Sequence, residues 1–283
     1  MLRSMYSGIS GMKNFQTKLD VIGNNIANVN TTGFKKGRIT FQDLMSQTSS
    51  PAQGSGDGRG GINPIQVGTG TTISSIDNVH TQGFRQNTER PLDLMIEGDG
   101  FFVLEMPDGS DAYTRAGNFY LDDNGDLVNA NGYYILDSNN EKITIPPEAK
   151  SFSIQKDGTV VYIAESQGVA GDGSGGDAQP ANDDEDGGEG QMEQVVAGQI
   201  QLATFPNAGG LEKAGENIWL ETDSSGNPTA GTADIISGAL EMSNVDLSEE
   251  FTEMITAQRG FQANTRIITT SDEILQELVN LKR

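Results

Sequence analysis

The beginning of the chain carries apolar side chains at helical spacing. The main row comprises Leu2, Met5, Ile9, Met12, Leu19 and Ile26, and a second row beside it comprises Phe15, Ile22 and Val29. Intervals of three, four and seven residues match the helical period, so this spacing predicts a helix over residues ~2–28. Gln16 and Gly23 interrupt the main row. We expect a helical first segment, residues 1–30, that buries an imperfect apolar face.

The end of the chain shows the same kind of pattern. Its apolar positions follow the alternating intervals of a heptad repeat, at Leu247, Phe251, Met254, Phe261, Ile268, Leu275 and Val279. Ser248, followed by Glu249 and Glu250, favours a helix N-terminus through capping and the helix dipole. We therefore expect a helix over residues ~247–281, inside a last segment that spans residues 236–283.

The middle of the chain alternates aromatic or β-branched residues with polar ones. Between these runs stand turn sequences such as Asn124-Gly125 and Asn131-Gly132, which are typical of β-hairpins. The pattern predicts a mostly antiparallel β domain over residues 90–235. The expected fold class is thus α+β: long N- and C-terminal helices form a coiled coil, with the β domain between them in sequence.

Two segments follow neither pattern. Residues 46–61 are rich in Ser and Gly, and we expect them to form a flexible loop within an extended linking region, residues 31–89. Residues 168–190 are rich in Gly and Asp and have too few apolar side chains to form a core. They predict a disordered acidic insertion in the β domain.

The composition excludes several functions. A formal net charge of −22 argues against nucleic-acid binding, which needs clustered Lys and Arg. The absence of cysteine excludes disulfides and thiolate metal sites. No apolar stretch reaches the ~20 residues of a membrane span, so membrane insertion is not expected. The N-terminus also lacks the features of a cleaved signal peptide, so export would need another route.

No catalytic, cofactor or metal site emerges from the motifs. The spacing G-x-G-x-x-G occurs at residues 56–61 and 171–176, but neither match follows a strand or opens a helix. Residues 122–126 resemble part of a calcium loop, yet they lack its Gly and Glu and fit a hairpin turn better. His80 is the single histidine, with no nucleophile pattern around it. Nothing indicates an enzyme.

Both terminal helices have apolar residues on more than one face. In the C-terminal helix the second row comprises Ile255, Ile267, Ile274, Leu278 and Leu281. One interpretation is intramolecular: the two helices pair as an antiparallel hairpin and cap the β domain. The other is self-assembly, because helices that are apolar on two faces need further partners. Asn24, Asn25 and Asn28 would then shape the turn after the first helix and bond between subunits.

Three quoted motifs, in this order, carry a resemblance to a known family. The sequence "SGISGMKNFQTKLDVIGNNIANVNTTGFKK" resembles the N-terminal signature of bacterial flagellar rod and hook proteins. "GDGFFVL" with "YTRAGNFYLDDNGDLV" resembles their β domain, and residues 242–281 resemble their C-terminal signature. The resemblance covers nearly the whole chain except residues 46–61 and 168–190.

The resemblance implies a structural role outside the cytoplasmic membrane. Members of the family polymerise into a hollow tube whose inner channel is lined by the terminal helices. They are exported unfolded through the flagellar type III apparatus without a cleaved signal. The partners implied are copies of the chain itself, adjacent rod proteins, hook–filament junction proteins, the hook cap and the export gate. Phe41 and Met45 fit the Phe-x-x-x-hydrophobic motif that the gate recognises, although they also fit an ordinary apolar cluster.

Three functional readings follow. The opening of the chain resembles above all the short hook proteins of Bacillus-type bacteria, which predicts a subunit of the hook, the flexible joint that transmits torque. The loop at 46–61 and the chain length also resemble the distal rod protein, which predicts a subunit of the rigid drive shaft. A third reading is a secreted, oligomeric, β-rich adhesin. The sequence favours the hook.

Overall fold

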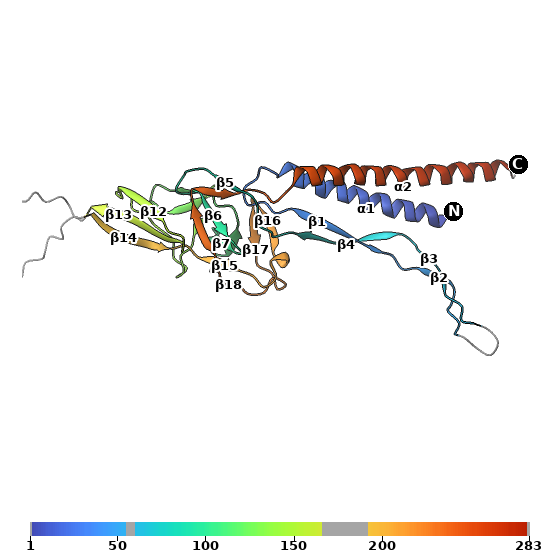
Figure 1. Ribbon diagram of the computed structural model, residues 1–283, viewed down its shortest axis with the longest axis horizontal. Coiled ribbons are helices and arrows are strands. Elements are labelled where there is room, and N and C mark those ends of the chain that lie inside the picture. The colour runs from blue at the N-terminus through green and yellow to red at the C-terminus, as the bar shows by residue number, and fades with distance from the viewer. Residues whose placement is uncertain (1, 55–59, 166–191, 282–283) are drawn as a thin grey trace, which may run out of the picture. The chain divides into compact units, whose positions relative to one another are not determined.

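The computed structural model describes residues 2–54, 60–165 and 192–281 (Figure 1). The predicted acidic insertion, residues 168–190, lies outside them, as do most residues of both G-x-G-x-x-G matches. The chain is α+β and divides into two compact units. The helical unit comprises residues 1–31, 35–81 and 243–283, and the β unit comprises residues 32–34 and 82–242.

Two long helices dominate the helical unit. They are α1 (Leu2–Ala27) and α2 (Leu247–Leu281), which lie side by side and antiparallel (Figure 1). Both predicted helices are confirmed. The cap of α2 differs from expectation, because Asp246 rather than Ser248 accepts the first amides: its Oδ1 lies 2.8 Å from the Ser248 nitrogen. No helix in the described ranges is long and apolar enough to cross a membrane.

Two β-hairpin stems complete the helical unit. Strand β1 (Gly37–Asp43) pairs with β4 (Thr71–Asn78), and β2 (Gln47–Ser50) pairs with β3 (Ile65–Val67), both antiparallel. Within the predicted loop at 46–61 the structure thus places strand β2 and a bridge at Gln53, and the other described residues there belong to neither helix nor strand. Ser and Thr favour extended backbone here, and the ladder bonds continue to the bridge between Gln53 and Ile62.

The β unit contains antiparallel strands throughout its described part. The largest sheet has nine strands in the order β16-β17-β8-β7-β11-β10-β9, with β15 bonded to β7 and β18 bonded to β15. Its strands are β7 (Phe101–Glu105), β8 (Asp111–Thr114), β9 (Phe119–Leu121), β10 (Leu127–Asn129), β11 (Tyr134–Ile135), β15 (Leu202–Thr204), β16 (Glu212–Gly215), β17 (Ile218–Leu220) and β18 (Thr229–Ala230).

Smaller sheets and one short helix complete this unit. A three-stranded sheet has the order β12-β13-β14, and two pairs join β19 with β6 and β20 with β5. The elements are β5 (Arg85–Asn87), β6 (Leu94–Glu97), β12 (Ser151–Ile154), β13 (Thr159–Glu165), β14 (Met192–Gln199), β19 (Asp234–Ser237), β20 (Ala239–Glu241) and the 3₁₀ helix η1 (Ala208–Gly210). The predicted antiparallel β domain is confirmed in its fold class.

The predicted hairpin turns are also confirmed. Gly125 takes a φ of 86° and its amide donates to the carbonyl of Asp122 at 2.8 Å, which joins β9 to β10. Gly132, with a φ of 84°, closes the turn from β10 to β11. Positive φ is a conformation that glycine adopts without steric cost, so these Asn-Gly pairs specify the turns. Residues 122–126, which resemble part of a calcium loop, form the turn of a β-hairpin.

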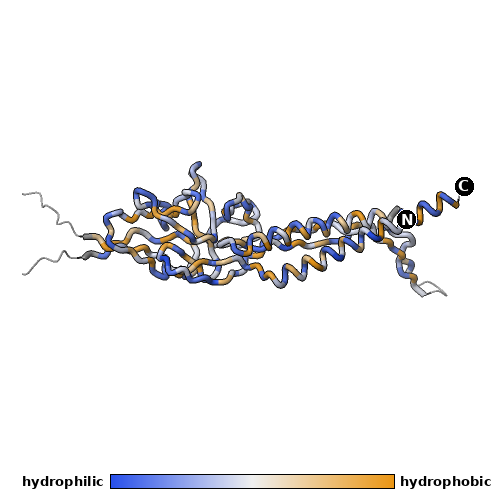
Figure 2. The backbone as a smooth tube through the Cα atoms, turned by 90° about the horizontal axis from the view of Figure 1, so that it is seen from above, coloured by the Kyte–Doolittle hydropathy of each residue, from blue (hydrophilic) through white to orange (hydrophobic). Residues whose placement is uncertain are grey.

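The core of the β unit is apolar and tightly packed. Phe102 and Phe119 are both 0% exposed, and their rings meet edge to face at 5.1 Å. A second cluster holds Trp219 and Tyr113, both nearly fully buried. The hydropathy colouring of Figure 2 shows apolar segments recurring along the strands of this unit. The β unit thus buries its own large apolar side chains.

Candidate self-assembly surface

One face of α1 packs against α2 through small residues. A Cβ at Gly8 would lie 3.4 Å from Ile268, and one at Gly11 would lie 3.0 Å from the Asn264 side chain. On α2 the small residue is Gly260, where a Cβ would come within 2.6 Å of the Phe15 ring. The contact at Gly260 leaves no room for a Cβ and the one at Gly11 is tight, whereas the one at Gly8 is an ordinary packing distance. Small residues thus let the two helix backbones approach each other.

A second face of α1 packs against the hairpin of β1 and β4. The side chain of Asn14 donates to Thr71 Oγ1 at 2.9 Å, and a Cβ at Gly37 would touch Val21. A Cβ at Gly70 would collide with Ser10. The α1 residues that face the hairpin are thus Ser10, Asn14 and Val21, and none of them belongs to the predicted main apolar row.

The predicted apolar row occupies a third face of α1. On the helical wheel Met5, Ile9, Met12, Leu19 and Ile26 lie beside the positions that contact α2 and away from those that contact the hairpin. Ile9 is 48% exposed and the other four are half-buried. The row is a heptad pattern, yet the contacts that hold α1 in its own chain use other positions.

The face of α2 that is buried in the single chain also differs from the predicted heptad row. Met254, Phe261, Ile268 and Leu275 are half-buried, as the prediction requires. Leu247, at the start of the same row, is exposed, and so are Phe251 and Val279 in the other row of the seam. The less exposed positions of α2 include instead a row that begins one residue before Phe251 and whose members are small or polar: Glu250, Ala257, Asn264 and Ser271. Leu247, Phe251 and Val279 are exposed in the single chain, and they stay predicted self-assembly residues.

Both helices therefore expose large apolar side chains. On α1 the exposed ones are Tyr6 and Ile9, and on α2 they are Leu247, Phe251, Ile255, Ile267, Ile274, Leu278, Val279 and Leu281. Phe251 is 50% exposed and Val279 is 66% exposed. Exposed apolar area of this extent, arranged in rows along helices, is typical of a surface that packs against another chain.

The three predicted asparagines lie at the end of α1, and the side chains of all three are hydrogen-bonded within the chain. Asn28 Nδ2 donates to the Asn24 carbonyl at 2.9 Å, and its Oδ1 accepts from Thr31 at 3.1 Å. Asn25 is 1% exposed and bonds to both backbone groups of Gly37, where β1 begins. These bonds close the turn after the helix, which agrees with the predicted elbow.

The two candidate export residues lie at the end of β1 and just beyond it. Phe41 is 41% exposed, and its ring centroid lies 6.3 Å from that of Phe15. Met45 is 89% exposed. Ile62, Ile65 and Val67, near or within β3, are exposed as well. The two side chains are therefore accessible in the folded chain.

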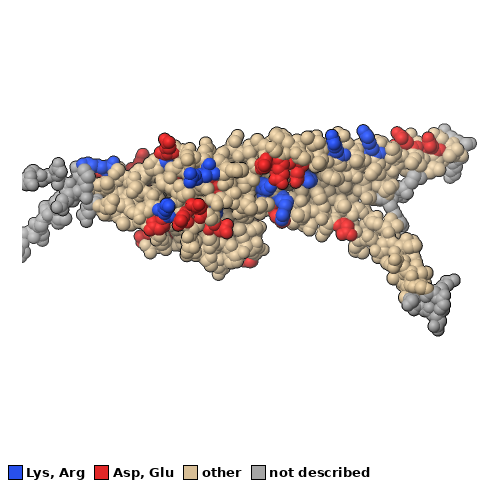
Figure 3. Space-filling model, in the orientation of Figure 1, with Lys and Arg blue, Asp and Glu red and all other residues tan. Residues whose placement is uncertain are grey.

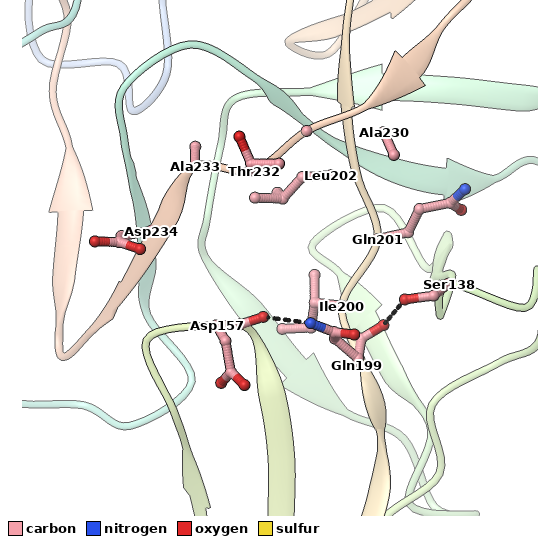
Figure 4. Close-up of a pocket in the computed structure, with 11 residues that line it drawn as sticks. Ser138, Asp157, Gln199, Ile200, Gln201, Leu202, Ala230, Thr232, Ala233 and Asp234 are labelled. Carbon is pink, nitrogen blue, oxygen red and sulfur yellow. Dashed lines mark hydrogen bonds between the residues drawn. The ribbon is translucent and has the colours of Figure 1, made fainter.

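The described residues hold no arrangement that favours catalysis or metal binding. They contain no group of three or more His, Asp or Glu placed to hold a metal ion. The cavity of about 350 Å³ in the β unit is lined by Asp157 and Asp234 with amide, hydroxyl and apolar groups (Figure 4). The carbonyl of Gln199 accepts from the Ser138 hydroxyl, and its side chain donates to the Asp157 carbonyl, so these polar groups serve the fold.

Sequence reasoning missed the small and buried polar residues of the helical unit. Gly260 lies outside the predicted apolar rows, yet it makes room for the Phe15 ring. Glu250 looked like a helix-start residue, whereas it is buried against Asn25. The glycines Gly8, Gly11 and Gly260 were the available signal, because glycine inside a helix costs stability and usually has a packing reason.

Three family models match the chain. "Flagella basal body rod protein" matches residues 5–35, "Flagellar hook protein FlgE/F/G D1 domain" matches residues 95–162, and "Flagellar basal body rod FlgEFG protein C-terminal" matches residues 236–281. These ranges cover most of α1, about the first half of the β unit and all of α2. The order is the one in which the three resembling motifs occur.

Full-length relatives agree with these models. The chain is 53% identical to the flagellar basal-body rod protein FlgG of Bacillus subtilis over 290 residues, which cover all of both chains. From Borreliella burgdorferi, the rod protein FlgG is 38% identical over 293 residues and the hook protein FlgE is 34% identical over 443, again covering both chains fully. The chain belongs to the family of flagellar rod and hook proteins.

Proposed function

We propose that this chain is a subunit of the distal flagellar rod, the shaft that transmits torque. Support comes from the rod relative of Bacillus subtilis, which aligns over 290 positions with the 283 residues of this chain. The alignment with the hook relative of Borreliella burgdorferi spans 443 positions, about 160 more than the 283 residues of this chain. The rod reading, an alternative in the sequence analysis, thus gains more support than the hook reading. The family is structural, not enzymatic.

The mechanism that we propose is polymerisation through the terminal helices. The apolar rows of α1 and α2 pack against the same helices of neighbouring copies as coiled coils. The observation that carries this proposal is the third face of α1, a heptad row that the chain's own contacts leave half exposed. Repetition of one heterologous contact generates a ring or an open helical tube, which suits a shaft.

Location and partners follow from this assignment as proposals. The chain acts in the basal body, outside the cytoplasmic membrane, and leaves the cytoplasm through the flagellar type III export gate without a cleaved signal. Its partners are copies of itself and adjacent rod and hook proteins. Phe41 and Met45 remain the proposed gate-recognition residues, because they fit the Phe-x-x-x-hydrophobic motif, which an unfolded chain also presents.

The hook is the second candidate function. The observation that favours it is the match to hook proteins along this entire chain, together with the resemblance of the opening segment to short hook proteins. The two roles differ in mechanics: a rod needs fixed contacts between subunits, whereas a hook needs contacts that slide as it bends. In a hook the junction proteins and the hook cap would be its partners.

Electron microscopy of basal bodies from cells lacking the gene tests both readings. A shortened rod without a hook is expected for a distal rod subunit. An intact rod without a hook would overturn the rod assignment and support the hook. Unaffected flagella would contradict both and favour the adhesin. Restoration of the missing part by the cloned gene is the control for effects on neighbouring genes.

A further inference from the structure

The joint between α1, β1 and α2 is built around two buried polar side chains. Asn25, 1% exposed, accepts a hydrogen bond from the Gly37 amide at 2.9 Å and donates one to the Gly37 carbonyl at 2.9 Å. Its Nδ2 also donates to Glu250 Oε2 at 3.2 Å, and Glu250 is 6% exposed. One carboxamide thus connects the end of α1, the start of β1 and the first turn of α2.

The cations around this joint bind other carboxylates. Lys18 pairs with Glu253 at 3.0 Å, and Lys36 pairs with Glu249 at 3.0 Å. Among the described residues, none of the Lys or Arg side chains lies within ion-pair distance of Glu250. The most buried carboxyl group of this joint is therefore the one that lacks an ion pair.

Further charged groups face the joint across a small cavity. Arg38 of β1 borders this cavity of about 240 Å³ and pairs with Asp77 of β4 at 3.4 Å. Asp246, which precedes α2, caps the helix with its carboxylate. On the face drawn in Figure 3, acidic side chains gather where α2 begins, with basic ones beside them. The surface around the joint is ion-paired, whereas its interior holds one neutral amide and one carboxyl group.

Burial raises the pKa of Glu250 above its ordinary value of 4.5. The carboxylates of Glu253 and Glu249 act in the same direction, while the hydrogen bond from Asn25 and the charge of Lys36 oppose it. A carboxyl whose pKa is raised on folding stabilises the fold below its unfolded pKa, and this stability is lost as pH rises through the folded pKa. Ionisation of this buried group is therefore a cost to the joint.

We propose that Glu250 is a pH-sensitive latch: its protonated form holds the first turns of α2 firmly against α1 and β1, and its ionised form loosens them. The proton comes from the solvent and returns to it, and the hydrogen bond from Asn25 to the carboxyl oxygen serves both forms. The latch is a property of the single chain and goes beyond the proposed polymerisation.

Hydrogen exchange of the full-length chain tests the latch. Wild type and Glu250→Gln are compared between pH 4 and pH 9, at a dilution where light scattering shows monomers, with rates corrected to protection factors. Glutamine mimics the neutral carboxyl group. We expect equal protection of the α2 amides at pH 4, and at pH 8 a gain of about fivefold or more in the variant. Glu249→Gln, which removes a neighbouring carboxylate that is half exposed, is the matched control.

Two outcomes would overturn the latch. The first is a Glu250→Gln chain whose protection follows the wild-type pH profile. The second is a Glu249→Gln chain that flattens the profile equally, since this would assign the effect to the net charge of the helix start. Because the measurement is made on monomers, a chain that never forms tubes would contradict the proposed function and leave the latch standing.

Discussion

The β unit and the helical unit bury their apolar side chains in different ways. In the β unit Phe102, Leu104, Phe119 and Ile135 are all 0% exposed, so its core is complete within one chain. In the helical unit the contact between α1 and α2 uses Gly, Asn and Glu, while large apolar side chains remain on the outside. The β unit therefore buries its large apolar side chains within one chain, whereas the helical unit leaves several of its own exposed, which is the basis of the proposed assembly.

The largest expected effect comes from removing α2. Deletion of residues 247–283 should abolish polymerisation and leave the β unit folded, because that unit contains its own core. Trp219, the single tryptophan, is 3% exposed in the β unit, so its fluorescence reports whether this core persists. Electron microscopy reports the tubes. Tubes formed by the truncated chain would contradict assembly through the helices.

A pair of alanine substitutions separates stability from assembly. Phe119→Ala should lower the free energy of unfolding of the β unit by about 3–5 kcal/mol, because Phe119 is fully buried. Ile9→Ala should change stability by less than about 0.5 kcal/mol, since its side chain is half exposed, yet slow polymerisation.

Urea unfolding followed by Trp219 fluorescence measures the first effect, and light scattering during assembly measures the second. The inferred difference between the two units would be wrong if Ile9→Ala destabilised the chain as much as a core substitution does. It would also be wrong if the Ile9→Ala chain polymerised at the wild-type rate.

Two helix glycines provide a matched test of the contact between α1 and α2. A Cβ at Gly260 would lie 2.6 Å from the Phe15 ring, so Gly260→Ala should destabilise the helix pair by about 1–3 kcal/mol. Nothing lies within 4 Å of a Cβ at Gly23, so Gly23→Ala should instead stabilise α1 by about 0.5–1 kcal/mol. Helix content against temperature, from far-ultraviolet circular dichroism, measures both. Equal shifts of the same sign would contradict the close packing.

Much of this fold could be predicted from the sequence because its signals are local. The helical period gave both long helices, and the Asn-Gly pairs gave the turns after β9 and β10. The face that each helix turns toward its partner could not be predicted in this way. An apolar row indicates burial but not whether the partner is in the same chain, and here Ile9 stays 48% exposed while Gly8 meets α2.

Contacts between residues far apart in the sequence could not be predicted from local patterns either. Arg115 and Glu241, separated by more than a hundred residues, form a buried ion pair at 2.7 Å. Glu241 also accepts from the Gly83 amide, and Arg115 donates to the Gly98 and Gly100 carbonyls. No local pattern marks either residue, because such a pair becomes visible only when the strands are in register.

The smallest expected effect concerns Tyr113 in the core of the β unit. Burial raises its pKa to about 12, and the nearby carboxylates of Asp111 and Glu221 act in the same direction. The neutral phenol is therefore the folded form. Its contribution to stability is complete below the ordinary tyrosine pKa of about 10 and is lost as pH rises toward the folded value, because the unfolded chain releases its proton first.

Absorbance at the phenolate band, followed from pH 8 to pH 13, should show a late titration step that Tyr113→Phe removes. The same variant should unfold with a weaker dependence on pH above pH 10, as measured by Trp219 fluorescence. A late step that survives Tyr113→Phe would assign it to another tyrosine. It would also weaken the inference that the β unit keeps its aromatic core closed without help from neighbouring copies.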